Sequence, residues 1–412
     1  MVSIFSRLAK FDTFRSFRHR NYRLFYAGNL LSNTGTWVQR VAQDWLALEL
    51  THSPTALGIV TALQFGPAIV FSLHGGRLAD RFSKRRLIIW TNAVSAATAG
   101  IIGVMVLDGS ITINRLYLLA LISGVAGAIQ APIWQTFVHD LVGTDDLPNA
   151  IALNSTNFNI GRLLGPAFSG YLISLFGTGP SFLLNAASYA FSIYALYAMR
   201  EHELFSSPPP DEDADGSVRA GLRYLRTRPD IVTILVLIAA TGTFGLNYQM
   251  FMALMAKQVF NQQADSFGLL GSVMAIGSIS GALFIARRTT KPTARFVHTL
   301  VLTFGAITAL AGLAPTYATY MAALPFCGFA ALTMLSSANA YVQSTTEPSF
   351  RGRVMGVYML VFIGGTPLGS LVVGALAEAI SPRASILVGG GIVVLVALTT
   401  ALVPMTRRTA VL

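Results

Sequence analysis

Charged residues are scarce in this 412-residue chain. Asp, Glu, Lys and Arg make up 11% of it, whereas hydrophobic residues make up 53%. A soluble globular domain carries about 25% charged residues. The composition therefore excludes an ordinary soluble protein and indicates an integral membrane protein.

Cysteine is almost absent, since Cys327 is the only one. A single cysteine excludes a disulfide within the chain and a multi-cysteine metal site. The sequence also lacks the GxxxxGK[ST] loop that binds nucleotide phosphates, so ATP does not drive the protein directly. Neither a paired His/Cys cluster nor a serine-histidine-carboxylate order outside the apolar runs is present. We therefore expect no enzyme activity, no cofactor and no metal.

The start of the chain shows no cleavable leader. Its first 23 residues are basic and aromatic (FRSFRHRNYR), without a short apolar core and a small-residue cleavage site. The first apolar run is therefore expected to remain as a membrane anchor.

Long apolar runs recur along the whole chain. Runs of about 18–20 apolar residues qualify as membrane-spanning helices. We predict twelve spans, which would place both termini on one side of the membrane. They lie at roughly 22–48, 55–77, 86–107, 115–138, 150–176, 181–199, 230–257, 266–286, 296–313, 318–344, 354–380 and 384–404.

Basic residues are concentrated on one side of this predicted topology. Of the 29 Lys and Arg residues, 24 fall in or beside the segments that lie inside if both termini are cytoplasmic. The positive-inside rule therefore predicts cytoplasmic termini in a bacterial inner membrane. The net charge of +11 then reflects topology and affinity for anionic lipid headgroups. Nucleic acid is excluded as a partner, because the basic residues occupy short inner loops.

A polar interval divides the predicted spans six and six. It begins with SSPPPDEDADG, which is too polar and proline-rich to pack, and continues with SVRAGLRYLRTRPD. The second part predicts a short amphipathic helix on the inner membrane surface, with a simple solvated connector as the alternative. The predicted divisions are a cytoplasmic segment at 1–21, a six-helix bundle at 22–199, the linker at 200–229, a second bundle at 230–404 and a tail at 405–412.

The two halves resemble each other. DDLPNAIALNSTNFNIGRLLGPAFSG and EPSFRGRVMGVYMLVFIGGTPLGS both lead from an acidic-proline loop into a helix with an internal proline, and Pro166 and Pro367 are 201 residues apart. Parallel halves of six helices are typical of transporters, with the substrate path between the halves.

The loop after the second span reads GGRLADRFSKRR. Gly76 would allow close helix approach, and Asp80 lies among Arg81, Arg85 and Arg86. A carboxylate there can cap a helix or pair with arginines, in contacts that differ between conformations. Positive-inside charge alone would explain the arginines but not the spacing from glycine to aspartate.

With this loop the chain resembles the major facilitator superfamily along essentially its whole length. GxLADRxxxRR after the second of twelve spans is the signature of that family, although Ser83 replaces its usual glycine. The resemblance implies an all-α membrane fold of two six-helix bundles. It also implies that they rock about a cavity lined chiefly by spans 1, 4, 7 and 10.

A second motif, GRLLGPAFSG, lies in the fifth span. Its Gly165-Pro166 step removes a backbone hydrogen bond, while Gly161 and Gly170 permit close packing. The motif is similar to one associated with exporters of the family, although a Gly-Pro step can also serve packing alone. It narrows the resemblance to the branch of the enterobactin exporter and macrolide-efflux-type proteins.

Polar residues form one face of the first span, where hydrocarbon disfavours them. Asn29, Asn33, Thr36, Arg40 and Gln43 share this face, and Asp44 lies at its edge. Intramembrane charges are functional candidates by default. Arg40 and Asp44 are four residues apart, so they can form a structural ion pair, couple to protons or contact substrate.

Two further ionisable residues are candidates for proton coupling. Arg162 lies near mid-membrane and could pair with Asp44 or attract an anionic substrate group, and Glu378 is a secondary proton site. Many exporters of the family carry an arginine in span 4, where this chain has Ala120. The absence of that arginine directs attention to the charges elsewhere.

The expected cavity helices also carry neutral polar and aromatic residues, which suit a bulky amphipathic ligand. Each residue alone could instead be a packing group. The candidates are Asn33, Trp37, Gln43, Gln130, Trp134, Gln135, Asn247, Tyr248, Gln249, Ser336, Asn339 and Gln343.

We therefore expect a monomeric secondary transporter that exports a siderophore or drug-like amphipathic molecule, by proton antiport and alternating access. An importer or facilitator of a metabolite, and a lysophospholipid-flipping transporter, are the alternatives on the same fold.

Overall fold

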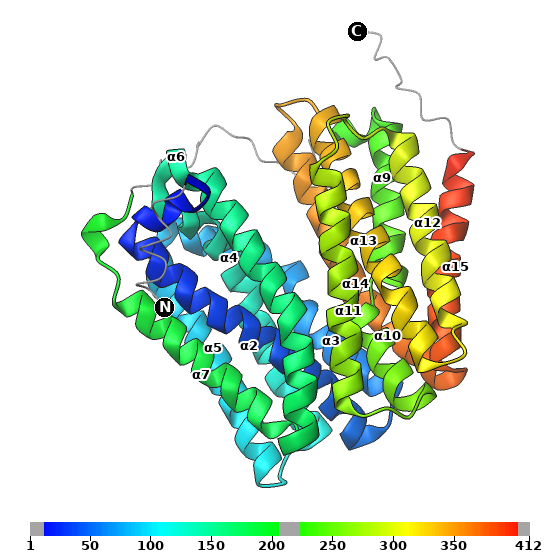
Figure 1. Cartoon of the computed structure of the whole chain (residues 1–412). Helices are drawn as coiled ribbons and strands as arrows, with labels where there is room; N and C mark the ends of the chain where they lie inside the picture. The colour runs from blue at the N-terminus through cyan, green and yellow to red at the C-terminus, as the bar shows by residue number, and fades with distance from the viewer. Residues whose placement is uncertain (1–11, 206–222, 403–412) are drawn as a thin grey trace. The chain divides into compact units, whose positions relative to one another are not determined.

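The computed structural model describes residues 12–205 and 223–402, in which all regular structure is helical (Figure 1). The expected all-α membrane fold is confirmed. The first six residues of the predicted amphipathic helix (217–222) and the predicted tail lie outside the described residues, whereas 223–226 are helical. The first half contains η1 (Asp12–Arg18), α2 (Arg20–Thr51), α3 (Pro54–Phe65), α4 (Pro67–Arg81), α5 (Lys84–Leu107), α6 (Ile113–Phe176), α7 (Gly179–Tyr197) and η2 (Glu201–Glu203).

The second half contains the remaining helices. They are α9 (Pro229–Ala240), η3 (Thr241–Gly245), α10 (Tyr248–Leu254), η4 (Met255–Val259), α11 (Ala264–Ala286), α12 (Ala294–Gly312), α13 (Tyr317–Thr345), α14 (Arg351–Ala379) and α15 (Pro382–Ala401). Most helix ends agree with the predicted spans to within a few residues, as α13 does with 318–344.

The chain folds into two compact units. Unit 1 comprises Met1–Thr51, Gly66–Asp211 and Gln263–Ser272, and unit 2 comprises His52–Phe65, Glu212–Gln262 and Val273–Leu412. The division falls near the predicted linker. In addition, α3 from the first half belongs to unit 2, and the start of α11 belongs to unit 1.

Unit 1 is organised around α2, which packs against α6 and α7, while α5 packs against α7 and α6. Gly35 of α2 permits one such close approach, because a Cβ atom there would lie 2.5 Å from the Asn185 side chain of α7. Asn185 also donates a buried hydrogen bond of 2.6 Å to Gln39. Small residues and paired amides therefore hold these helices together.

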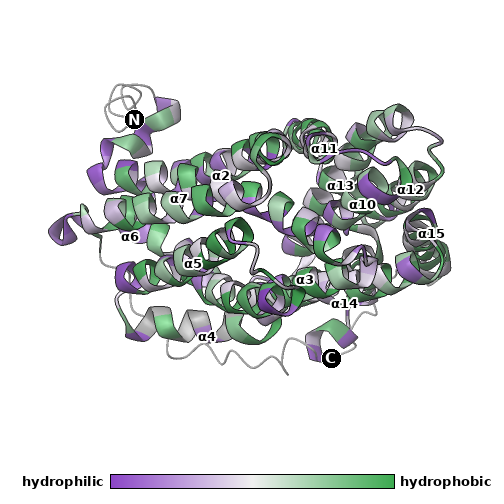
Figure 2. Cartoon of the chain, turned by 90° about the horizontal axis from the view of Figure 1, so that it is seen from below, coloured by the Kyte–Doolittle hydropathy of each residue, from purple (hydrophilic) through white to green (hydrophobic). Residues whose placement is uncertain are grey.

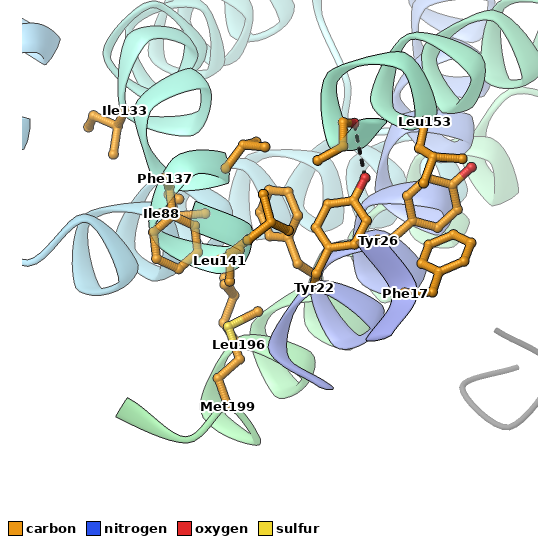
Figure 3. Close-up of a cluster of buried hydrophobic side chains, with 14 residues drawn as sticks. Phe17, Tyr22, Tyr26, Ile88, Ile133, Phe137, Leu141, Leu153, Leu196 and Met199 are labelled. Carbon is orange, nitrogen blue, oxygen red and sulfur yellow. Dashed lines mark hydrogen bonds between the residues drawn. The ribbon is translucent and has the colours of Figure 1, made fainter. Parts of the chain in front are cut away.

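A cluster of aromatic and aliphatic side chains fills one end of unit 1 (Figure 3). Tyr22 is completely buried in it, and its hydroxyl donates to the Ala150 carbonyl at 3.0 Å. The other buried members are Phe17, Phe25, Tyr26, Ile88, Ile133, Phe137, Val138, Leu141, Val142, Ala150, Leu153, Leu196 and Met199.

In unit 2, α12 packs against α13 and α15, and α14 packs against α3 (Figure 1). Gly277 of α11 lies directly against the backbone of Pro325 in α13, so that any Cβ atom there would collide with the carbonyl oxygen. These contacts bring backbones close together where hydrocarbon supplies no hydrophobic drive for helix association.

Two predicted spans differ locally from regular helices. The predicted span 55–77 is divided at Gly66 into α3 and α4, and 230–257 contains the π-helical turns η3 and η4. The predicted spans 115–138 and 150–176 are the two parts of α6, which is interrupted by a kink at Gly143. The φ of 69° at this residue favours glycine.

Hydrophobic residues extend along most helices of both units (Figure 2). Nine segments of the described chain are long and apolar enough to cross a membrane, and one of them is the 64-residue α6. Neither α2 nor α7 is among these segments, although both are helical. The number of twelve spans remains a prediction.

Candidate functional site

The charged residues of the first span lie inside unit 1. Asp44 is 3% exposed, and it interacts electrostatically with Arg40. The Arg40 guanidinium lies 4.9 Å from the centroid of the Trp37 ring, and Tyr189 of α7 also interacts with it. The arrangement brings Arg40 and Asp44 together, as their spacing predicts, and adds two aromatic neighbours that the sequence does not reveal.

Gln43, next to Asp44, is a buried carboxamide without a hydrogen-bond partner among the described residues. Its side chain is 0% exposed, and both amide atoms are unpaired. Buried amides are nearly always paired with protein or water, so this group marks a place where water, a ligand or another conformation supplies the partner. The same face of α2 therefore carries a charge pair and an unsatisfied amide.

The remaining polar residues of this face join α2 to its neighbours. Asn33 donates to the Asn157 carbonyl of α6 at 2.9 Å, and the hydroxyls of Thr36 and Tyr189 lie 3.0 Å apart. Asn33 is therefore part of the α2–α6 contact in this conformation.

The GRLLGPAFSG motif packs against this same stretch of α2. A Cβ atom at Gly161 would collide with the Asn33 amide, and one at Gly165 would lie 2.5 Å from the Cβ atom of Trp37. Gly170 contacts the backbone at Ala264, where α11 begins. The glycines therefore make the close packing that the motif predicts.

Pro166 and Arg162 belong to the same part of α6. The Pro166 carbonyl lies against Gly268 of α11, and the neighbouring Ala167 amide donates to the Ser272 hydroxyl at 3.2 Å. Arg162 is half-buried in this region. Its predicted pairing with Asp44 remains a prediction.

Three candidates on the first part of α6 have different surroundings. Gln130 donates to Asn92 of α5 at 2.6 Å, and the Trp134 ring lies 5.2 Å from that of Phe25 at the edge of the aromatic cluster. Of these three side chains, only that of Gln135 is exposed.

Three other candidates line a cavity of about 500 Å³ between α13 and α14 in unit 2. Ser336, Asn339 and Gln343 supply its polar groups, and Gln343 donates to Asn339. The remaining lining residues are Leu335, Ala340, Tyr358, Met359 and Phe362. The rings of Tyr358 and Phe362 are stacked with centroids 6.4 Å apart. Hydrogen-bonding amides beside stacked rings suit an amphipathic molecule.

Tyr248, a predicted cavity residue, is packed among side chains of unit 2, and its role in a cavity stays a prediction. Tyr248 is 5% exposed, and its hydroxyl lies 2.6 Å from that of Thr308 in α12. Its ring packs against Phe251 and Phe304. Tyr248 therefore belongs to the interior of unit 2, because a tyrosine can be buried wherever its hydroxyl finds a partner.

Its neighbours Asn247 and Gln249 are only partly satisfied. Asn247 is 4% exposed and donates to the Thr243 carbonyl at 2.7 Å, but its Oδ1 atom lacks a partner among the described residues. The buried Nε2 atom of Gln249 lacks one as well. Both amides lie beside the π-helical turn η3, a departure from regular helix that is frequent at functional sites.

The basic loop after α4 forms a network at one end of unit 1. Arg85 donates to the carbonyl oxygens of Leu196 and Tyr197 and pairs with Glu201 at 2.7 Å. Lys84 of the same basic segment pairs with Asp140 at 2.8 Å. Arg81 and Arg86 are exposed, and the surroundings of Gly76 and of the Asp80 carboxylate are outside what the structure describes.

Glu378 caps a helix in this structure. Its carboxylate accepts hydrogen bonds from the Ser53 hydroxyl at 2.6 Å and from the Thr55 amide at 3.0 Å, where α3 begins. A carboxylate at a helix N-terminus satisfies free amides and complements the helix dipole. This contact fixes α3 to the end of α14 within unit 2.

Sequence reasoning missed a buried ionic network at the start of α9. Arg228 and Asp230 form a two-pronged pair at 2.9 and 2.8 Å, and the Tyr341 hydroxyl donates to Asp230 at 2.8 Å. Arg228 also donates to the Thr345 carbonyl and the Tyr224 hydroxyl, both at 2.8 Å. Its hydrogen bonds to Asp230 raise the pKa of Arg228. The Arg-Pro-Asp sequence immediately before an apolar run was the available signal.

An all-helical fold with several helices that are long and apolar enough to cross a membrane defines a multi-pass membrane protein. The family model described as "Transmembrane secretion effector" matches residues 11–410. The chain belongs to that family, within the major facilitator superfamily.

Curated relatives are similar over most of the chain. The Staphyloferrin A transporter of Staphylococcus aureus is 23% identical over 86% of this chain and 89% of its own. The multidrug efflux pump Tap of Mycolicibacterium fortuitum is 24% identical over 87% and 89%. The enterobactin exporter EntS of Shigella flexneri is 25% identical over 89% and 88%.

A solved structure shares the fold. It is a bacterial homologue of the human lysosomal transporter Spinster, with a TM-score of 0.72 and 16% identity, covering 94% of this chain and 96% of that one. The comparisons agree with the fold and with the branch that the sequence motifs indicate.

The buried Arg228–Asp230 pair makes a test of what stabilises unit 2. Asp230→Ala leaves the guanidinium without its carboxylate, and removing one partner of a buried pair costs about 3–5 kcal/mol. We expect a clear fall in the thermal unfolding temperature in detergent. Asp12→Ala is the matched control, because that carboxylate is 98% exposed and should be almost neutral. An equal effect of the two substitutions would contradict a stabilising role for the network.

Proposed function

We propose that this protein exports a siderophore or drug-like amphipathic molecule across the bacterial inner membrane in exchange for protons. Both chain termini lie in the cytoplasm in this proposal. The observation that carries it is the polar face of α2, where Asp44 and Gln43 are buried, Arg40 is half-buried, and the Gln43 amide has no partner among the described residues. Such a face is costly in hydrocarbon and is retained where ions or substrates pass.

The relatives and the unit 2 cavity support the substrate class. The relatives are named for staphyloferrin A, enterobactin or multiple drugs. The cavity at Ser336, Asn339 and Gln343 combines neutral hydrogen-bonding groups with the Tyr358 and Phe362 rings. Such a lining binds large ligands by ring stacking and a few hydrogen bonds, without demanding one charge. Gln130, Gln135, Asn247 and Gln249 are further proposed contacts.

In the proposed cycle the two units rock between conformations. The loop with Asp80, Arg81, Arg85 and Arg86 forms an inner gate, supported by the bonds of Arg85 to Leu196, Tyr197 and Glu201. The GRLLGPAFSG segment is, beside the inner gate, the second element that changes position between the two conformations in this proposal. Its Gly165-Pro166 step has no backbone donor at the proline and lies directly against α2, so a small bend there shifts Trp37.

Proton coupling is assigned to Asp44 with Arg40 as its partner and Arg162 nearby. A proton on the Asp44 carboxylate removes its negative charge and weakens the attraction to Arg40. The released guanidinium then favours a different arrangement of the polar face, which biases the two conformations. Glu378, in contrast, holds α3 in place through its bonds to Ser53 and Thr55.

The direction of transport is tested by accumulation and resistance in cells that lack their own exporters. Expression should lower the intracellular amount of at least one compound from a panel of macrolides, dyes and catecholate siderophores, and raise resistance to it. The matched control is Asp44→Asn expressed to the same level in the membrane. Increased accumulation would indicate an importer instead, and transport confined to lysophospholipids would indicate a lipid flippase.

The coupling role of Asp44 is tested in proteoliposomes with an imposed pH gradient. Asp44→Asn keeps the shape of the side chain but cannot carry the exchanged proton, so pH-driven transport should fall to the level of empty vesicles. Glu378→Gln, which retains a hydrogen-bond acceptor at the start of α3, should keep pH-driven transport. Folding of both variants is checked by size-exclusion chromatography. Full pH-driven transport by Asp44→Asn would refute the assignment.

The unit 2 cavity is tested by substrate affinity. Asn339→Ala removes one hydrogen-bonding group from the lining, and a hydrogen bond of about 1 kcal/mol corresponds to roughly a fivefold rise in KM. Asn159→Ala is the matched control, because among the described residues that amide bonds only to the Ser155 carbonyl of its own helix. Equal KM values for wild type and Asn339→Ala would place the substrate elsewhere.

A further inference from the structure

A second cavity in unit 2 lies at the end of α11, away from the residues assigned to transport. It has a volume of about 670 Å³. Its lining residues are Ser280, Leu283, Phe284, Arg287, Arg288, Thr290 and Phe329. All of them except Phe329 come from the last two turns of α11 and the segment that follows, and Phe329 comes from α13.

One part of this cavity is apolar and aromatic. The rings of Phe284 and Phe329 lie with centroids 5.6 Å apart, and the two side chains are 51% and 37% exposed. Leu283 beside them is 55% exposed. In a membrane helix such side chains are in contact with acyl chains, so this part of the cavity is open to lipid.

The other part is basic. Arg287 and Arg288 follow directly after the last residue of α11 and are both exposed. Arg288 lies with its guanidinium 3.8 Å from the centroid of the Phe296 ring and donates to the Thr290 hydroxyl at 2.9 Å. Neither arginine has a carboxylate within ion-pair distance among the described residues.

These contacts orient the Arg288 side chain without neutralising its charge. A ring and a hydroxyl hold the guanidinium, yet its terminal nitrogens keep donors for a further acceptor. Arg287 adds a second full charge at the same rim. Two adjacent guanidinium groups attract phosphate more strongly than a neutral polar molecule.

We propose that this cavity binds an anionic phospholipid, with its phosphate at Arg287 and Arg288 and an acyl chain along Leu283, Phe284 and Phe329. Basic pockets between membrane helices at the cytoplasmic surface recognise anionic headgroups in this way. A free phosphate would use the basic rim but would leave the exposed rings without a ligand. An acyl chain and a phosphate on one molecule match both parts of the cavity together.

The site is independent of the exported substrate. Its residues are not those of the α2 polar face or of the cavity at Asn339, and it requires only that the protein lie in a membrane. Bound lipid would fix the end of α11, which leads through a short segment to α12 at Ala294. A transport assay therefore tests the transport proposal, and a lipid-binding assay tests the lipid proposal separately.

The test is binding of phosphatidylglycerol to the full-length purified protein in detergent, by native mass spectrometry and a titration. Each basic residue beside an anionic headgroup contributes roughly a factor of five in affinity. Arg287→Gln with Arg288→Gln should therefore weaken binding about 25-fold. The matched control, Arg295→Gln with Arg351→Gln, removes the same charge from two exposed arginines outside the cavity and should leave binding unchanged.

Two further arms distinguish a lipid from a free anion. Phe284→Ala should weaken phosphatidylglycerol binding by about two- to threefold, because it removes part of the dispersion contact with the acyl chain. Inorganic phosphate and phosphatidylcholine at the same concentration should not displace the lipid. Unchanged binding by the Arg287/Arg288 double variant would overturn the proposal. Equal competition by inorganic phosphate, with no effect of Phe284→Ala, would also overturn it and identify a free-phosphate site.

Discussion

Hydrocarbon offers no hydrogen-bond partners, and this constraint governs the whole structure. Every backbone group within the membrane has to be satisfied by the protein itself, which leaves continuous helices as the solution for this chain. Side-chain hydroxyls and amides follow the same rule. Ser169 donates to the Val38 carbonyl and Ser370 to that of Gly58, and both serines are fully buried. These two serines are 201 residues apart, the same interval as Pro166 and Pro367. The resemblance between the two halves therefore includes a serine that donates to a backbone carbonyl of another helix.

Close backbone packing is the second consequence, because apolar side chains gain little by leaving lipid for protein. Gly58 lies against the Ser370 carbonyl, Gly268 against Pro166, and Gly277 against Pro325. At each of these positions a Cβ atom would collide with backbone that a rotamer change cannot move. The glycines therefore determine which helix faces meet, and the larger side chains fill the space that is left.

The sequence predicted the positions of the helices more accurately than it predicted which face of each helix is buried. Spans such as 266–286 and 318–344 were recognisable because an apolar run long enough to cross a bilayer is a strong signal. The four-residue spacing of Arg40 and Asp44 places them close enough for the Asp44 charge to act on Arg40, whereas a direct ion pair stays a prediction. Asn247, Tyr248 and Gln249 were placed on one cavity although consecutive helix residues point about 100° apart. Tyr248 accordingly lies in the core. The buried network of Arg228 and Asp230 was not predicted, because its third member, Tyr341, is distant in sequence.

The division of polar groups between the units bears directly on how transport could be coupled. In unit 1, the α2 face carries Arg40 and Asp44, and Arg162 lies on α6. In unit 2, the cavity at Ser336, Asn339 and Gln343 has no lining residue that is charged at neutral pH. A carboxylate that also bound the substrate would favour cationic substrates, whereas amide groups and aromatic rings accept molecules of differing charge. In the proposed assignment protons and substrate use different groups, so neither competes directly for the site of the other. Coupling between them then has to come from conformational states that both ligands bias, which is the requirement for exchange by alternating access.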